Sequence, residues 1–139
     1  MKVQNFSFSV TTKGYNDIVD ISANVLEQIK SSGVVNGNAL VFCPGSTCGI
    51  TTLEYESGCI ADLKQYYEAV APMKKEYKHN ERWGDGNGFS HVRAAITKSN
   101  FIFPIINGAP ALGAWQQIVL IDFDNHKRSR SIIVQIIGE

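Results

Sequence analysis

The sequence predicts an α+β fold: a β-rich mixed or antiparallel sandwich with about two flanking helices, forming a single domain over residues 1–139. Residues 3–11 alternate apolar and polar side chains with a period of two, which indicates a strand. Residues 17–30 place Ile18, Ile21, Val25 and Ile29 at helical spacing instead. Most other apolar runs are short and bounded by turn residues, and a chain of 139 residues has the size of one domain.

Two helices are expected. The first begins at Asn16 or Asp17 and ends at Gly33, and the second covers roughly residues 62–71 and stops before Pro72. Residues 73–82 are a solvated connection or a short turn of helix, and residues 92–96 fit either a helix or a strand.

About seven strands make up the rest, and the Asn107-Gly108 dipeptide is a turn signal. The long run 115–124 is expected to pair as a hairpin with the strand that follows it. The clearest strands cover residues 3–11, 39–43, 50–56, 101–106, 115–124 and 130–137.

Composition and charge argue against several classes of partner. Thirteen basic and thirteen acidic residues cancel, so the chain lacks the basic excess that captures nucleic acid or an anionic membrane. No apolar run approaches a membrane span and no N-terminal segment resembles a signal peptide, so a cytoplasmic location is expected. Zero net charge also favours self-association.

The three cysteines, Cys43, Cys48 and Cys59, show neither a disulfide framework nor C-x-x-C spacing. Cys43 and Cys59 are most simply core residues. Cys48 sits in a hydroxyl-rich bend, where a nucleophilic role would need an adjacent cation or base.

The richest stretch for chemistry runs from Trp83 to Arg93. Its glycines let a ligand approach the main chain, while Asp85, His91 and Arg93 supply a proton acceptor, a group that titrates near neutrality and a donor fork that fits phosphate. The regular oxygen spacing of an EF-hand is absent. The ligand-binding candidates between the aromatic and basic residues are Gly86, Asn87 and Gly88.

Two further clusters carry polar groups. The bend Ser46-Thr47-Cys48-Gly49 offers hydroxyls and free N–H groups to an anion, and Glu54 and Glu56 share one face of the next strand. Trp115 could form a flat wall for an aromatic ligand, with Gln116 pointing to the opposite side.

Taken together and in this order, these clusters resemble the YjbQ-like family, whose members are labelled secondary thiamine-phosphate synthases. The resemblance covers nearly the whole chain. It rests on Gly45-Ser46-Thr47-Cys48-Gly49-Ile50-Thr51-Thr52-Leu53-Glu54, Tyr77 with His79, Asp85-Gly86-Asn87-Gly88-Phe89-Ser90-His91-Val92-Arg93-Ala94, Asn107-Gly108 and Leu112-Gly113-Ala114-Trp115-Gln116.

The resemblance implies a β-rich sandwich that assembles as a homotrimer, with pockets near subunit boundaries. It also implies a weak or secondary activity that joins a thiazole phosphate to a pyrimidine methyl diphosphate and releases diphosphate. Many relatives carry His-Thr-Thr or His-Thr-Ser in place of Gly45-Ser46-Thr47, and Asn in place of Leu53, so a mechanism that needs three histidines does not transfer.

For that reaction, the sequence predicts a composite site. His91, Glu54 and Asp85 are the catalytic candidates, with Arg93, Ser46 and Thr47 on phosphates and Trp115 or Trp83 stacked on a ring. A divalent metal, Mg²⁺ or Zn²⁺, is a candidate cofactor, held by His79, His91 and either Asp85 or Glu54.

Two alternatives stay open at this point. One is a non-enzymatic trimer that binds a phosphorylated or anionic metabolite, and the other is a hydrolase that uses metal-bound water.

Overall fold

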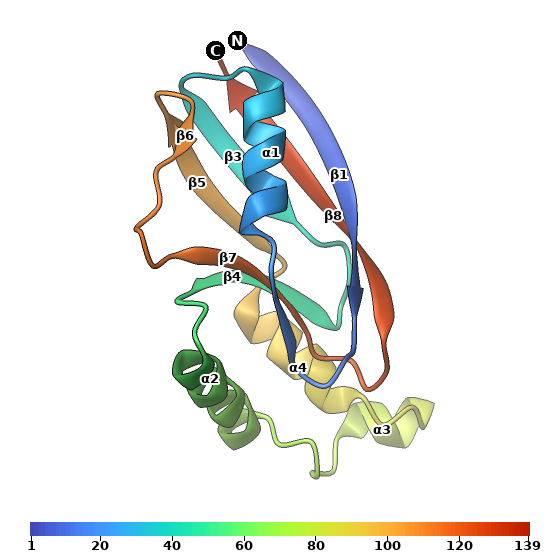
Figure 1. The fold of residues 1–139 in the computed structure, drawn as a ribbon. Helices are drawn as coiled ribbons and strands as arrows, with labels where there is room; N and C mark the ends of the chain where they lie inside the picture. Colours follow the sequence, from blue (N-terminus) through green and yellow to red (C-terminus); the bar gives the residue numbers. More distant parts are fainter.

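The computed structural model describes residues 1–139 as two antiparallel sheets and four helices (Figure 1). The five-stranded sheet has the order β1-β8-β3-β5-β6 and the three-stranded sheet has the order β2-β7-β4. The strands are β1 Lys2–Thr12, β2 Asp17–Asp20, β3 Gly37–Phe42, β4 Cys48–Leu53, β5 Asn100–Ile106, β6 Ala109–Pro110, β7 Gln117–Asp122 and β8 Arg128–Gly138. The helices are α1 Ser22–Ser32, α2 Ser57–Val70, α3 Lys78–Trp83 and α4 Gly88–Thr97.

The α+β prediction is confirmed, with two more helices than expected. None of the four helices combines the length and apolar character that a membrane span requires.

The two ends of the chain form the longest ladder. β1 and β8 pair antiparallel from Lys2 opposite Gly138 to Thr12 opposite Arg128. Figure 1 shows the N- and C-termini side by side at one end of this ladder. The alternating pattern that predicted β1 is explained by this pairing, because Phe6, Phe8 and Val10 pack on the larger core and the polar residues between them are exposed.

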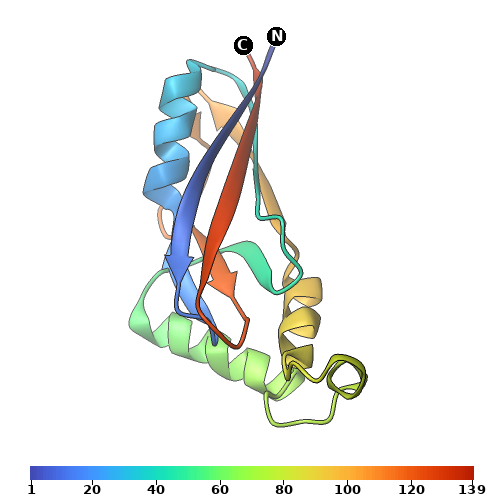
Figure 2. The ribbon, with the colours of Figure 1, turned by 90° about the vertical axis from the view of Figure 1, so that its right-hand side faces the viewer.

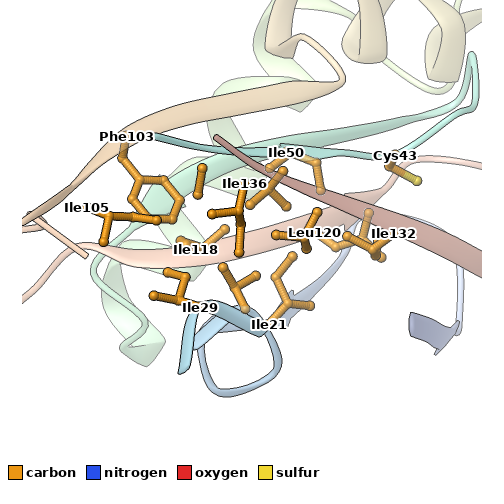
Figure 3. Packing of buried hydrophobic residues seen from close by; sticks show 14 of the residues in the cluster. Ile21, Ile29, Cys43, Ile50, Phe103, Ile105, Ile118, Leu120, Ile132 and Ile136 are labelled. Atoms are coloured by element: carbon orange, nitrogen blue, oxygen red, sulfur yellow. The ribbon is translucent and has the colours of Figure 1, made fainter. Parts of the chain in front are cut away.

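β7 is the strand on which the core is built, because both of its faces are buried. Ile118 and Leu120 belong to the larger apolar cluster, between the two sheets and α1 (Figure 3). Val119 and Ile121 point the other way, into a smaller cluster with Tyr67 of α2. A strand buried on both faces reads as a continuous apolar run, which is what residues 118–121 show.

The layers follow from these two clusters. α1 and the three-stranded sheet lie on the same face of the five-stranded sheet, and α2 and α4 lie at the end of the molecule away from the termini (Figure 2). The opposite face of the five-stranded sheet exposes apolar side chains: Val3, Ile102, Ile106, Ile133 and Ile137.

The first helix starts later than predicted. Residues 17–20 form β2, which pairs with β7 from Asp17 opposite Asp122 to Asp20 opposite Val119. Ile18 and Ile21 fit helical spacing, but they enter different clusters, Ile18 the smaller and Ile21 the larger. The helix begins only after Asp20, whose carboxylate accepts the Ser22 N–H at 2.9 Å.

The predicted hairpin between residues 115–124 and 130–137 is wrong. β7 and β8 lie in different sheets, and β8 instead pairs with β1 and β3. The chain between them crosses from one sheet to the other at Asp122 and Asp124, whose buried carboxylates bond to Arg130 and Arg128 of β8. Charge pairing at the crossing therefore replaces the main-chain ladder of a hairpin.

The stretch 83–93 is mostly helical instead of an open loop. Gly84 ends α3 in the left-handed conformation at φ 69°, and α4 begins at Gly88, which settles residues 92–96 as helix. At the other end of the chain, Asn107 and Gly108 both have positive φ, 53° and 75°, as the turn signal between β5 and β6 predicted.

Candidate functional site

A pocket of about 360 Å³ lies between one face of α4 and the segment that joins β3 to β4. This volume falls within the roughly 300–1,000 Å³ of small-molecule sites. The lining residues are Gly45, Ser46, Cys48, His91, Ala94, Ala95, Lys98, Ser99 and Asn100.

The α4 wall has helical spacing. Ala94 and Ala95 follow His91 by three and four residues, so these three share one face of the helix, and Lys98 follows directly after the last helical residue, Thr97. The two alanines leave the space, and the histidine and the lysine place a proton acceptor and a cation at its ends. This wall is thus polar at both ends and small in the middle.

Lys98 has an unusual backbone conformation. Its φ is 78° and its ψ is 154°, a region that only glycine adopts easily. Both of its peptide groups are held: its N–H donates to Ala94 O at 3.0 Å, and its carbonyl accepts the Ile50 N–H at 3.0 Å. The strain is therefore imposed by α4 and β4 together.

His91 faces a second histidine. The ring centroids of His91 and His79 are 4.3 Å apart and tilted by 39°. His79 Nδ1 lies 3.3 Å from Asp85 Oδ1 without the alignment of a hydrogen bond, and no other group bonds to it. Asp85, His79 and His91 thus form a row that leads from the surface to the pocket.

The pKa of His91 lies below its ordinary value. Burial lowers this pKa most, and His79 lowers it further, while Asp85, Asp124 and a hydrogen bond with the Ser46 backbone oppose the shift. His91 is therefore neutral at neutral pH and can accept a proton.

A buried ionic network fixes the walls of the pocket. Asp122 accepts from Arg130 Nε at 2.8 Å and from Arg130 Nη2 at 2.7 Å, and Arg130 Nη2 also donates to Thr47 Oγ1 at 2.8 Å. Asp124 accepts from Arg128 Nε at 2.8 Å and from Asn87 Nδ2 at 3.2 Å. Thr47 lies in the β3–β4 segment and Asn87 directly precedes α4, so the network holds the two segments that form the pocket walls in one place.

Asp124 is held ionised by these contacts. Burial raises the pKa of this carboxyl, but hydrogen bonds from Arg128, the Asn125 N–H and Asn87 outweigh burial and bring the pKa to about 2.

The structure brings together three of the residues that sequence reasoning selected: Ser46, Cys48 and His91 line the same pocket. Thr47 is buried beneath it, bonded to Arg130 and Asp124. Sequence reasoning missed Lys98, Ser99 and Asn100, which follow the end of α4 and also line the pocket.

Glu54 and Trp115 lie elsewhere. Both line a separate hollow of about 300 Å³ with Asp20, Tyr55, Glu56 and Gln117. Gln116 is bonded to the Gly113 N–H and to Thr52 Oγ1, away from both of these residues. The three-walled composite site expected from the sequence is therefore not formed within one chain.

Arg93 is used by the fold and does not reach the pocket. Its side chain is fully buried, and its guanidinium donates to Ala71 O, Asn16 Oδ1 and Glu68 Oε2. A phosphate could replace these acceptors only if the packing of α2 against α4 were broken, so the expected role of Arg93 on phosphate is corrected to a structural one.

The glycines and Asn87 also have structural roles. A Cβ on Gly88 would lie 2.5 Å from Tyr77 Cβ, and the Gly88 N–H already donates to Asn80 Oδ1 at 2.8 Å. Gly86 has φ 70° in the turn between the helices. These residues shape the start of α4, and they lie outside the pocket lining.

Comparison with known proteins decides the family. The profile of the family described as "UPF0047 protein YjbQ-like" matches residues 6–139. The chain belongs to the UPF0047 (YjbQ-like) family. A UPF0047 protein of Methanothermobacter thermautotrophicus is 33% identical over 139 residues, which is all of this chain and 95% of the relative.

Solved structures of UPF0047-like proteins share the fold. A hypothetical protein from Aeropyrum pernix superposes with a TM-score of 0.91 at 26% identity, covering 98% of this chain and 99% of that one. An uncharacterised YjbQ/UPF0047 protein from Clostridium acetobutylicum gives 0.86 at 34% identity, covering 95% and 99%.

The expected metal site of this UPF0047 chain does not fit the side chains present. No three His, Cys, Asp or Glu side chains are arranged to hold a metal ion. His79, His91 and Asp85 are neighbours, with Asp85 Oδ1 3.3 Å from His79 Nδ1 and the centroids of the two imidazole rings 4.3 Å apart, but the three do not form a set that could hold a metal ion.

We expect Asp124→Asn to lower the free energy of unfolding of this UPF0047 protein by about 2–4 kcal/mol at neutral pH, because the amide leaves Arg128 without its buried partner. The folded pKa of about 2 lies below the unfolded value of roughly 3.9, so this stability is present above pH 4 and is lost as the pH falls toward 2. Urea unfolding at a series of pH values measures the difference between wild type and variant, which should shrink over that window. Asp62→Asn, on the exposed face of α2, is the control. A difference that stays constant down to pH 2 would contradict this account.

Proposed function

We propose that the pocket between α4 and the β3–β4 segment is an active site for small phosphorylated ligands, and that its reaction is thiamine-phosphate synthase-like. In that reaction, a thiazole phosphate attacks a pyrimidine methyl diphosphate, and diphosphate leaves. The observation that supports this most is Lys98, a lysine held in a backbone conformation suited to glycine at the edge of the pocket.

Strain of this kind needs a reason. A non-glycine residue in this region costs about 1–3 kcal/mol and persists where the surrounding structure fixes it. Glycine would occupy the position without that cost. The Lys98 side chain therefore has a use that glycine could not serve: it places an ammonium group at the pocket.

The other lining groups suit a phosphate as well. Ser46 and Ser99 offer hydroxyl donors and Asn100 offers an amide, while Lys98 is the one cation among the lining residues. Lys98 would neutralise the charge that builds up on the departing diphosphate, which is the main task in this reaction.

His91 would act on the pyrimidine. Because its pKa is lowered, the neutral ring can accept a proton or hydrogen bond from the exocyclic amine, whose electrons help expel diphosphate. The bond that forms joins the thiazole nitrogen to the methylene carbon, and the bond that breaks joins that carbon to the diphosphate oxygen. The protein contributes position and charge and forms no covalent intermediate.

The test is product formation by purified protein, with both substrates and with or without added Mg²⁺, followed by chromatography of thiamine phosphate. Lys98→Ala should reduce the rate by about 10²-fold or more, as expected for loss of a group that stabilises developing charge. Lys98→Gly should lose the same activity yet raise the melting temperature, because it removes the backbone strain.

Lys30→Ala, in the last turn of α1, is the matched control and should keep full rate. If Lys98→Ala also keeps full rate, the pocket is not the active site. Thermal stabilisation by either substrate without any turnover would instead identify a binding protein for a phosphorylated metabolite.

The pH profile gives a second prediction. The rate should fall at acid pH with an apparent pKa below 6.5, because protonated His91 cannot accept a proton. His79→Gln removes a group that lowers the pKa of His91, so the acid limb should move to higher pH. His126→Gln, at an exposed histidine far from α4 in sequence, should leave the limb in place. If the acid limb of the pH profile does not move in His79→Gln, His91 is not the proton acceptor.

We also propose that the chain assembles as a homotrimer through the outer face of the five-stranded sheet. Val3, Ile102 and Ile106 are each more than half exposed on strands whose other face is core, and large exposed apolar patches mark contact surfaces. Asn100 of the pocket precedes Ile102 by two residues on β5 and is exposed on the same face, so the pocket borders this face. The arrangement fits pockets near subunit boundaries.

Sedimentation velocity of the purified protein should give a trimer. Ile102→Lys should shift it to smaller species, because a charge would be buried at the centre of the proposed contact. Val70→Lys, at an exposed apolar residue of α2, should leave the trimer intact. A monomeric wild type would refute the assembly.

A further inference from the structure

Two thiols lie in contact at the floor of the pocket. The Sγ atoms of Cys43 and Cys48 are 3.1 Å apart and share a hydrogen bond, and both residues are buried. Cys48 also lines the pocket, beside Ser46 and His91. The proposed function makes no use of either sulfur.

Gly45 gives access to this pair. A Cβ on Gly45 would lie only 2.9 Å from Cys48 Sγ, so the absence of a side chain leaves the sulfur directly beneath an exposed residue of the pocket wall. Both side chains are fully buried, but Cys48 borders the pocket and Cys43 does not, so a small, uncharged solute in the pocket lies nearer to Cys48.

The guanidinium of Arg130 lies near the Cys48 sulfur. The same Cβ on Gly45 would lie 3.1 Å from Arg130 Nη1, so the guanidinium and the Cys48 sulfur approach one point from two sides. Asp122 fixes this guanidinium in place, and a neighbouring cation favours the thiolate form of Cys48.

The pKa shifts of Cys48 and Cys43 agree with the positions of the two sulfurs and of Arg130. The hydrogen bond with Cys43 lowers the pKa of Cys48 and Arg130 adds to the lowering, while burial, Asp122 and Asp124 oppose it. The hydrogen bond with Cys48 and burial both raise the pKa of Cys43, which keeps the shared proton.

We propose that Cys48 and Cys43 form a peroxide-reactive dithiol that closes reversibly to a disulfide at the pocket floor. The Cys48 thiolate attacks one oxygen of a hydroperoxide, the O–O bond breaks, and hydroxide leaves and takes up a proton as water. Cys43 then loses its proton and attacks the Cys48 sulfenic sulfur, the S–O bond breaks, and a second water leaves. In total, two thiols are oxidised to one disulfide and hydrogen peroxide is reduced to two waters.

Little movement is needed. The sulfurs must approach from 3.1 Å to a bond of about 2.05 Å, and the bond would link the end of β3 to the start of β4. The closed loop contains Ser46, so oxidation would tighten one wall of the pocket. This site goes beyond the proposed synthase activity and does not depend on it.

Cys59 is an internal control. It lies on α2, away from the pocket lining, and burial raises its pKa, with further raising by Glu56, Glu54 and Asp62. A raised pKa leaves less thiolate, so Cys59 should react at least about tenfold more slowly than Cys48 with the same peroxide.

The experiment exposes the reduced full chain to hydrogen peroxide, alkylates the remaining thiols at intervals and measures the mass of each fragment. A glutamate-specific protease cuts at Glu54, so Cys43 and Cys48 share one fragment and Cys59 falls on another. We expect the Cys43–Cys48 fragment to lose both alkylation sites together, while the Cys59 fragment stays alkylated. Dithiothreitol should restore both sites.

Variants give the order of the steps. Cys43→Ala should stop at a sulfenic acid on Cys48 that dimedone traps, Cys48→Ala should remove the fast reaction, and Cys59→Ala should behave as wild type. The proposal is overturned if the wild-type Cys43–Cys48 fragment stays fully alkylated, or if Cys59 reacts first. The wild-type fragments decide this whether or not a variant folds.

Discussion

Two buried carboxylates, Asp122 and Asp124, hold the two sheets and the pocket together. Asp122 is the last residue of β7 and Asp124 follows it by two residues. Their partners come from separate parts of the chain: Arg128 and Arg130 on β8, Thr12 on β1, and Asn87 before α4. Buried charges are costly unless each is paired and hydrogen-bonded. Here both carboxylates are paired with arginines, and a rearrangement of the β3–β4 segment or of α4 would break the hydrogen bonds that Thr47 and Asn87 make to this network. The geometry of the pocket is therefore a consequence of this network.

The spacing of apolar residues and the residues typical of turns were enough to predict much of the fold from the sequence. β1 alternates because one of its faces is core, and Asn107-Gly108 turns because both residues adopt positive φ easily. The same rules failed at Ile18, which fits helical spacing with Ile21 although the two side chains enter different clusters. They failed again at β8, because short sequence separation favours a hairpin and the sequence does not reveal the β1 ladder that competes with it.

The site was predictable only where residue type alone indicates chemistry. Ser46, Cys48 and His91 could be grouped from their motifs, and they share the pocket. The role of Arg93 could not be predicted, because the sequence does not distinguish an arginine that binds phosphate from one that is buried in the fold. Only its burial in the structure shows which of the two it is. Lys98 is the converse case. What distinguishes it is a backbone angle, and no spacing in the sequence reports such an angle.

The ladder between β1 and β8 has a consequence for how the chain is made. Its strands are the first and last of the sequence, so its contacts have nearly the largest sequence separation that the chain allows. During synthesis, β1 leaves the ribosome with its edge unpaired and stays so until β8 follows, while β3 also waits for β8 as its neighbour. Folding should therefore be completed late and cooperatively, once β8 has been made, and the alternating polar residues of β1 protect the exposed strand from aggregation in the meantime.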